Sequence, residues 1–179
     1  MAPWRDWYHV NGNTYGTWLP GDPRGWRSRH HKEHVEGDYT SPPPPGTYDA
    51  LHAAARDAMK RPPVRLTRPQ RRVAAGTIAA ALRDLAVQVL AVSVDAIHYH
   101  VLGRFVGVDV RRTVGRAKKI ASDRLGEAGL KGVVWARGCR PLPIQDRQHQ
   151  INVYGYVRKH VLKGACVWTF RDGIIEPTG

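Results

Sequence analysis

The segment from residue 67 to about residue 105 limits the fold more than any other part of the chain. Thr67 and Gln70 form a T-x-x-Q capping box with a proline between them, which is typical of the first turn of a helix. Apolar residues follow at helical spacing as far as Leu85, so we predict a helix over about 68–86. Two strand-length runs, 87–94 and 97–105, come directly after it, and Asp95-Ala96 supplies a turn between antiparallel strands. A helix followed by a strand pair indicates an α+β domain.

The rest of the chain extends this pattern on both sides. Residues 7–14 have the aromatic and β-branched composition of a first strand, and residues 133–135 have that of a short later strand. Apolar residues at helical spacing predict a second helix from Val110 to about residue 125. We also expect a final helix over 146–162. The resulting order, β-α-β-β-α-β, predicts a ferredoxin-like sandwich with an antiparallel sheet and an extra C-terminal helix.

Residues 15–66 interrupt the pattern after the first strand. They are rich in proline, glycine and basic side chains, and the four prolines after Ser41 favour an extended polyproline II spacer. A short helix is expected within them over about 49–60. With 179 residues, the chain is long enough for one domain but too short for a second beside it. We therefore interpret 1–179 as a single domain and 15–66 as an insertion within it.

The charge of the chain predicts the class of its partner. Lys and Arg number 28 against 15 Asp and Glu, which gives a formal net charge of +13. This excess excludes an acidic disordered tail and favours a polyanion, with nucleic acid ahead of a membrane surface. The two cysteines, Cys139 and Cys166, form neither a metal-type pair nor a disulfide framework, and no signal peptide or membrane-spanning run is evident. We expect a cytoplasmic, nucleoid-associated protein with no membrane partner.

His98-Tyr99-His100 is the sharpest candidate site. In a strand, residues i and i+2 share one face, so both imidazoles point to one side while Tyr99 points to the other. Two histidines placed in this way can bind one metal ion. In a chain with nine histidines, the alternative is a pair of surface or hydrogen-bonded strand histidines.

Tyr156 and His160 form a second candidate, because residues i and i+4 of a helix lie on one face. If they face the strand histidines, three imidazoles and one phenol surround a common point. The alternative is a core tyrosine and a histidine that stabilises the end of a helix. Tyr154 is a rival nucleophile, but it points roughly opposite Tyr156 on the helix, so we favour Tyr156.

Together these motifs resemble the single-tyrosine HUH transposases, the insertion-sequence-200-like family, and within it the REP-associated tyrosine transposase branch. Residues 92–105 resemble the strand pair that carries the family's His-hydrophobe-His motif, residues 156–167 are similar to its tyrosine helix, and residues 14–25 resemble a frequent N-terminal stretch. Residues 26–66 have no counterpart. The chain departs from the pattern at His160-Val161, where the branch commonly has Asn-Pro, and at Tyr99, where an aliphatic residue is usual.

The resemblance implies that His98 and His100 bind a divalent metal ion, Mg²⁺ or Mn²⁺, that His160 is a further ligand, and that Tyr156 is the catalytic nucleophile. The implied activity is cleavage and rejoining of single-stranded or hairpin-bearing DNA through a 5′-phosphotyrosine intermediate, as a transposase or a domesticated relative. Three imidazoles suit Mn²⁺ or a later transition metal better than Mg²⁺, which prefers oxygen. Family members often act as dimers, so the resemblance also allows a homodimer.

Basic side chains on the two predicted helices are candidates for holding DNA phosphates, with a solvated helix face as the alternative for each. These candidates are Arg68, Arg71, Arg72, Arg111, Arg112, Arg116, Lys118 and Lys119.

Aromatic and histidine groups add further candidates for contact with DNA. The tryptophans that can stack on unpaired bases are Trp18, Trp26 and Trp135, with burial in the core favoured for the last. The spacing of His30, His31 and His34 permits a metal ion, but we interpret these histidines as part of a basic loop that contacts DNA.

Two functions from other classes also fit parts of the sequence. A catalytically inactive module that binds DNA hairpins would keep the fold and the charge, and its binding would depend on salt but not on metal. A three-histidine zinc hydrolase would use His98, His100 and His160 around a bound water. The hydrolase leaves Tyr156 and the net charge without a role.

Overall fold

The computed structural model describes residues 4–24 and 44–177, and it is an α+β protein. The described chain contains four α-helices and one six-stranded antiparallel sheet. It divides into two compact units, one made of the residues up to Thr14 and from Arg65 onward, the other of Tyr15–Val64. No helix in the described ranges combines the length and the apolar character that a membrane span requires.

The sheet belongs to the first unit, and its strands run antiparallel to their neighbours throughout. In spatial order they are β4 (Arg140–Pro143), β1 (Trp7–Asn13), β3 (His98–Arg104), β2 (Gln88–Val94), β5 (Cys166–Thr169) and β6 (Gly173–Ile175). The predicted strands over 7–14, 87–94 and 97–105 are confirmed as β1, β2 and β3, with β1 and β2 as the neighbours of β3 on its two sides.

The prediction of a strand over 133–135 is wrong. In that segment Trp135 makes only an isolated bridge with Thr14, and the strand that pairs with β1 on the side away from β3 is β4, a few residues later. Pro141 and Pro143 make this segment unlike a typical strand, because proline cannot donate to the hydrogen-bond ladder. The prolines fit because β4 is an edge strand, paired on one side only. The hairpin of β5 and β6 was not predicted either.

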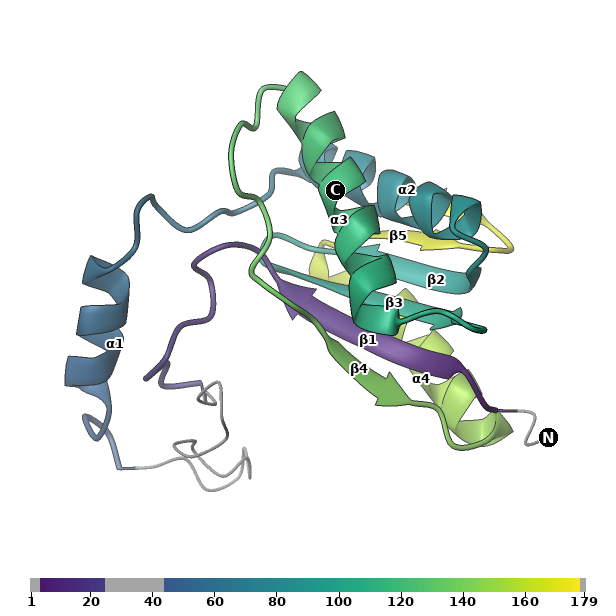
Figure 1. Ribbon diagram of the computed structural model, residues 1–179, viewed down its shortest axis with the longest axis horizontal. Coiled ribbons are helices and arrows are strands. Elements are labelled where there is room, and N and C mark those ends of the chain that lie inside the picture. The colour runs from purple at the N-terminus through teal and green to yellow at the C-terminus, as the bar shows by residue number, and fades with distance from the viewer. Residues whose placement is uncertain (1–3, 25–43, 178–179) are drawn as a thin grey trace. The chain divides into compact units, whose positions relative to one another are not determined.

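Helices α2 (Arg68–Asp84) and α3 (Val110–Glu127) lie on one face of the sheet, and α4 (Arg147–Lys159) lies on the other (Figure 1). All three confirm helices predicted from the sequence. At the start of α2, the Gln70 side chain accepts a hydrogen bond from the Thr67 backbone N–H at 2.9 Å, as one half of the predicted capping box requires. A short 3₁₀ helix, η1 (His160–Lys163), follows α4 directly.

Alternation along β3 assigns its side chains to the two helical layers. Leu102 packs with Val153 and Val157 of α4 in a buried cluster, so the residues in phase with it, His98 and His100, also face α4. Tyr99 faces the opposite layer, where the ammonium group of Lys118 on α3 lies 5.6 Å from its ring centre. The sheet therefore presents its histidines on the α4 side.

The second unit consists of Tyr15–Val64. It contains α1 (Asp49–Asp57), which confirms the short helix expected over 49–60 and buries none of its residues. The backbone N–H of Val64 donates to the carbonyl of Tyr15 at 2.9 Å, so a hydrogen bond links the first and last residues of the unit. Gly21 has a φ of 78°, and a Cβ there would lie 2.6 Å from the backbone nitrogen of His52. Only glycine fits both the backbone conformation and this close approach.

Candidate metal centre

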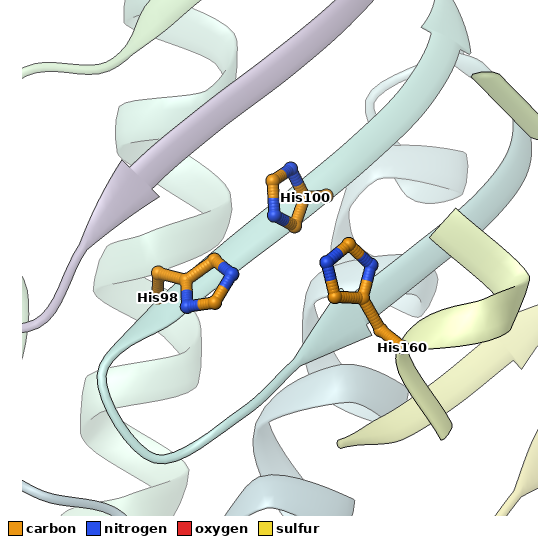
Figure 2. A group of neighbouring side chains, drawn as sticks. All are labelled: His98, His100 and His160. Atoms are coloured by element: carbon orange, nitrogen blue, oxygen red, sulfur yellow. The ribbon is translucent and has the colours of Figure 1, made fainter. Parts of the chain in front are cut away.

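Three imidazole rings meet on the α4 side of the sheet (Figure 2). His98 and His100 come from β3, and His160 comes from the first residue of η1. One ring nitrogen from each lies within 4.8 Å of the others. The strand places two of the three by its period of two residues, and the C-terminal end of α4 brings the third to them.

His100 is the inner member of the cluster. It is buried, and it stands between Asn11 of β1 and Ser93 of β2, its partners in the strand register. Its Nε2 atom is buried without a hydrogen-bond partner, and so is Nδ1 of His160. Of these two nitrogens, only Nε2 of His100 faces the other rings, whereas Nδ1 of His160 lies on the side of its ring away from them (Figure 2). Buried polar atoms almost always have a partner, so Nε2 of His100 is available to a ligand.

Two residues outside the cluster hold the strand histidines. A carboxylate oxygen of Asp95 accepts a hydrogen bond from Nδ1 of His98 at 2.5 Å. The other oxygen of Asp95 accepts the backbone N–H groups of Ile97 and His98, both at 2.7 Å, across the turn between β2 and β3. On the other side of the cluster, Nε2 of His9 lies 3.0 Å from Nδ1 of His100. Such outer contacts orient metal-binding histidines in many proteins.

His100, His160 and the neighbouring His9 are uncharged around pH 7, and Asp95 is ionised. Burial, followed by repulsion from the neighbouring imidazoles, lowers the pKa of His100 and of His160 below the usual 6.5. Burial likewise lowers the pKa of His9 to about 4. Burial alone would raise the pKa of Asp95, but the hydrogen bonds from His98 and the backbone lower it overall, so the carboxylate stays ionised. Neutral imidazoles keep the lone pairs that bind a cation.

Tyr156 lies one helical turn before His160, as the i, i+4 spacing predicts. Its ring centre is 4.6 Å from that of His160, 5.4 Å from that of His100 and 6.0 Å from that of His9, in each case edge to face. The side chain is 48% exposed, so a substrate can reach it. Tyr154 points away and packs against the apolar cluster around Leu102 and Val157.

The donor set fits a divalent transition metal ion. Imidazole nitrogen suits Mn²⁺, Zn²⁺ and their neighbours, whereas Mg²⁺ requires mostly oxygen ligands and dehydrates reluctantly. Nε2 of His100, which has no hydrogen-bond partner, faces the other two rings and is the nitrogen that a bound ion would satisfy (Figure 2). Three protein ligands leave further positions for water or substrate, which is the arrangement of catalytic rather than structural sites.

The structure separates the predicted phosphate-holding residues into two groups of four. Arg111, Arg112 and Arg116 are exposed on α3, as is Lys119, which pairs with Asp123. These four lie on the helical layer opposite the histidines (Figure 1).

The remaining four candidates already have protein partners. Arg68 and Arg72 form ion pairs with Glu176 at 3.7 and 3.0 Å. The Arg71 guanidinium donates to the backbone carbonyls of Leu66 and Gly164. Lys118 is buried, and its ammonium group donates to the carbonyls of Ala136 and Gly138 at 2.8 and 2.7 Å, so its charge is held inside the protein.

The tryptophan and histidine candidates have different outcomes. Trp135 is buried beside Tyr99, and Trp18 is 38% exposed, with the guanidinium of Arg24 4.5 Å from its ring centre. Trp26 and the histidines His30, His31 and His34 lie outside the described residues.

Sequence reasoning missed two residues of the site, His9 and Asp95. Asp95 had a visible signal, because an Asx turn three residues before a ligand histidine brings a carboxylate to that histidine. His9 lies 91 residues from His100, and no local spacing connects them. Only the pairing of β1 with β3 brings them together.

No protein-family model, curated protein or solved structure matches this chain, so its own residues carry the functional argument.

Proposed function

We propose that this protein cleaves and rejoins single-stranded or hairpin-bearing DNA, with Tyr156 as the nucleophile and a divalent metal ion at His98, His100 and His160. The observation that carries the proposal is the accessible phenol of Tyr156 packed against two of the three imidazoles. The strand order β4-β1-β3-β2 supports the ferredoxin-like interpretation, because it places the histidine strand at the centre of the sheet beneath the tyrosine helix.

The proposed reaction exchanges one phosphate ester for another. The phenolic oxygen of Tyr156 attacks phosphorus and loses its proton, a new O–P bond forms, and the bond to the 3′-oxygen breaks. That oxygen takes a proton and leaves as a 3′-hydroxyl, while the 5′ end stays attached to the tyrosine. Attack by a 3′-hydroxyl reverses these steps without ATP, because the link keeps the ester energy. The bound metal ion supplies Lewis acidity toward the phosphate oxygens.

The charge of the site favours an anionic substrate. Three neutral imidazoles add no negative charge to a divalent cation, and the one carboxylate in contact with the cluster, that of Asp95, balances only half of it. A loaded site of this composition has a net charge of about +1 and attracts a phosphodiester. The +13 charge of the whole chain acts in the same direction.

A covalent-adduct assay tests the proposal. The protein is mixed with hairpin-bearing single-stranded DNA and Mn²⁺, and a protein–DNA adduct that survives denaturing electrophoresis is expected. Tyr156→Phe should abolish the adduct, and Tyr154→Phe, a matched change on the same helix, should keep it. An adduct that persists in Tyr156→Phe would contradict the assignment of the nucleophile.

The histidine cluster also supports a second function, hydrolysis at a three-histidine zinc site. In that case the purified protein would hold one zinc ion per chain, hydrolyse esters in Tyr156→Phe as well as in the wild type, and form no adduct with DNA. The same two proteins therefore distinguish the two functions.

A further inference from the structure

The two strand histidines are held by acceptors of different kinds. His98 donates to a carboxylate, which can only accept a hydrogen bond. His100 meets a second imidazole, that of His9, which can either accept or donate. The two buried rings of His9 and His100 are stacked, with centres 5.2 Å apart and an interplanar angle of 25°. His9 and His100 thus share one hydrogen bond. The positions of the two nitrogen atoms do not show which ring is the donor.

The direction of that bond decides whether His100 can bind a cation. A hydrogen bond between two neutral imidazoles contains a single proton. If Nδ1 of His100 donates it, Nε2 keeps a lone pair within the cluster. If Nε2 of His9 donates it, His100 carries its own proton on Nε2, and the cluster has two available ligands instead of three.

We propose that His9 is a positioning residue that accepts the hydrogen bond and thereby holds His100 in the tautomer with an unprotonated Nε2. The inference rests on the proposed metal centre and adds the group that makes its inner ligand available. The lack of a hydrogen-bond partner at Nε2 of His100 supports this inference. A buried nitrogen with a lone pair is satisfied by a bound cation, whereas a buried N–H that faces two other imidazoles would oppose the binding of a cation.

The strand register explains why a residue so distant in sequence has this role. His9 pairs with Leu102 and Asn11 pairs with His100, so His9 lies on the same face of the sheet as His100, diagonally across β1 and β3. At 8% exposure, His9 has little access to water that could replace its partner. The pair therefore forms with the sheet and is present before any ligand arrives.

Metal affinity tests the proposal in the full-length chain, with Mn²⁺ as the probe and calorimetry as the measurement. His9→Phe keeps a ring of similar size but removes the acceptor, and we expect about 10- to 100-fold weaker binding. His9→Gln places an amide oxygen near the position of Nε2 and should restore affinity to within about threefold of the wild type. His52→Phe, the same change at a histidine in the unit formed by Tyr15–Val64, is the matched control and should bind as the wild type does.

Nitrogen NMR of the imidazoles measures which ring nitrogen carries the proton. A purely structural role of His9 would not affect this measurement. In the unmodified chain loaded with Zn²⁺ as a diamagnetic probe, His100 should be protonated at Nδ1, and His9 should be protonated at Nδ1 with a bare Nε2. A proton on Nε2 of His9 in the loaded protein would overturn the proposal. Wild-type affinity in folded His9→Phe, or equal damage in His9→Gln and His9→Phe, would overturn it as well.

The experiments separate this inference from the proposed DNA chemistry. The expected tautomers without any DNA adduct would refute the nuclease and leave the role of His9 intact. Failure of both Mn²⁺ and Zn²⁺ to bind would overturn the metal centre and this inference together. If His9→Phe does not fold, the NMR measurement on the unmodified chain decides.

Discussion

The two faces of strand β3 have opposite character although they alternate residue by residue. On the α4 face, His98 and His100 present imidazole nitrogens to a shared polar space. On the other face, Tyr99 is fully buried, with its ring centre 5.4 Å from that of Trp135. One strand therefore supplies a candidate site on one side and core packing on the other. The comparison teaches that a reactive cluster can be built on a central strand without giving up the core.

Lys118 and His100, two buried polar residues on opposite faces of the sheet, differ in how their side chains are satisfied. Lys118, on the Tyr99 side, donates to two backbone carbonyls and holds the segment before β4 against α3. Nε2 of His100, on the α4 side, makes no hydrogen bond. The hydrogen bonds of Lys118 stabilise the fold, whereas Nε2 of His100, which faces two other imidazoles, is available to a ligand.

Substitutions of the adjacent residues His100 and Tyr99 should show the largest difference between the two faces of β3. His100→Ala removes the inner ligand, so we expect Mn²⁺ affinity to fall by at least about 100-fold while the chain stays folded. Tyr99→Ala opens a cavity in the core and should cost about 3–5 kcal/mol of unfolding free energy. Calorimetry with Mn²⁺ and urea denaturation measure the two effects. If both variants lose the same amount of Mn²⁺ affinity and of unfolding free energy, the two faces of β3 do not have different roles.

Acidification should destabilise the metal-free chain through the α4 face alone. The pKa of His9 is lowered to about 4, and those of His100 and His160 are lowered too, whereas unfolded histidines titrate near 6.5. Between pH 6.5 and about 4, the unfolded chain binds more protons than the folded one, so the free energy of unfolding decreases as pH falls. Each histidine that stays neutral contributes about 1.4 kcal/mol per pH unit.

Urea denaturation at pH 7 and pH 5 measures this slope. His160→Asn removes one titrating group from the cluster and should flatten the dependence. His52→Asn, in the unit formed by Tyr15–Val64, is the control and should leave it unchanged. A slope that is insensitive to His160→Asn would contradict the assignment of the acid sensitivity to the cluster.

The salt dependence of DNA binding should show whether the helical layer that contains α3 binds DNA. Arg112 and Arg116 are exposed on α3, across the sheet from the histidines. If this layer holds phosphates, each change to alanine should reduce the log–log slope of affinity against salt by about 1 and leave Mn²⁺ affinity unchanged. Arg124→Ala, at the far end of α3 and paired with Glu127, is the control. Unchanged slopes in all three variants would exclude this layer from DNA binding.

The smallest expected effect concerns the hydroxyl group of Tyr99. It is buried without a hydrogen-bond partner, and burial raises the pKa of Tyr99, so the phenol stays neutral. Tyr99→Phe removes an unsatisfied polar atom and should change the unfolding free energy by less than about 1 kcal/mol, toward greater stability. Thermal denaturation measures the change. A loss of more than about 2 kcal/mol would show that the hydroxyl has an unseen partner.

Local patterns in the sequence were sufficient for the elements with strong periodicity. The capping box and apolar spacing predicted α2, and the run of β-branched residues predicted β2. The same local logic placed His98 and His100 on one face and Tyr156 beside His160. It failed at β4, since two prolines mask a strand that is tolerated only because it lies at the sheet edge.

The sequence by itself therefore determined which side chains share a face, because that depends on the period of a strand or helix. Only the tertiary structure decided which faces meet. It placed His160 beside the strand histidines, and it brought His9 to His100 from a strand that is distant in sequence. It also placed α3, with its basic side chains, on the side of the sheet opposite the histidines. The physical reason is that strand order and helix packing arise from burial of the whole apolar surface, which no local window of residues contains.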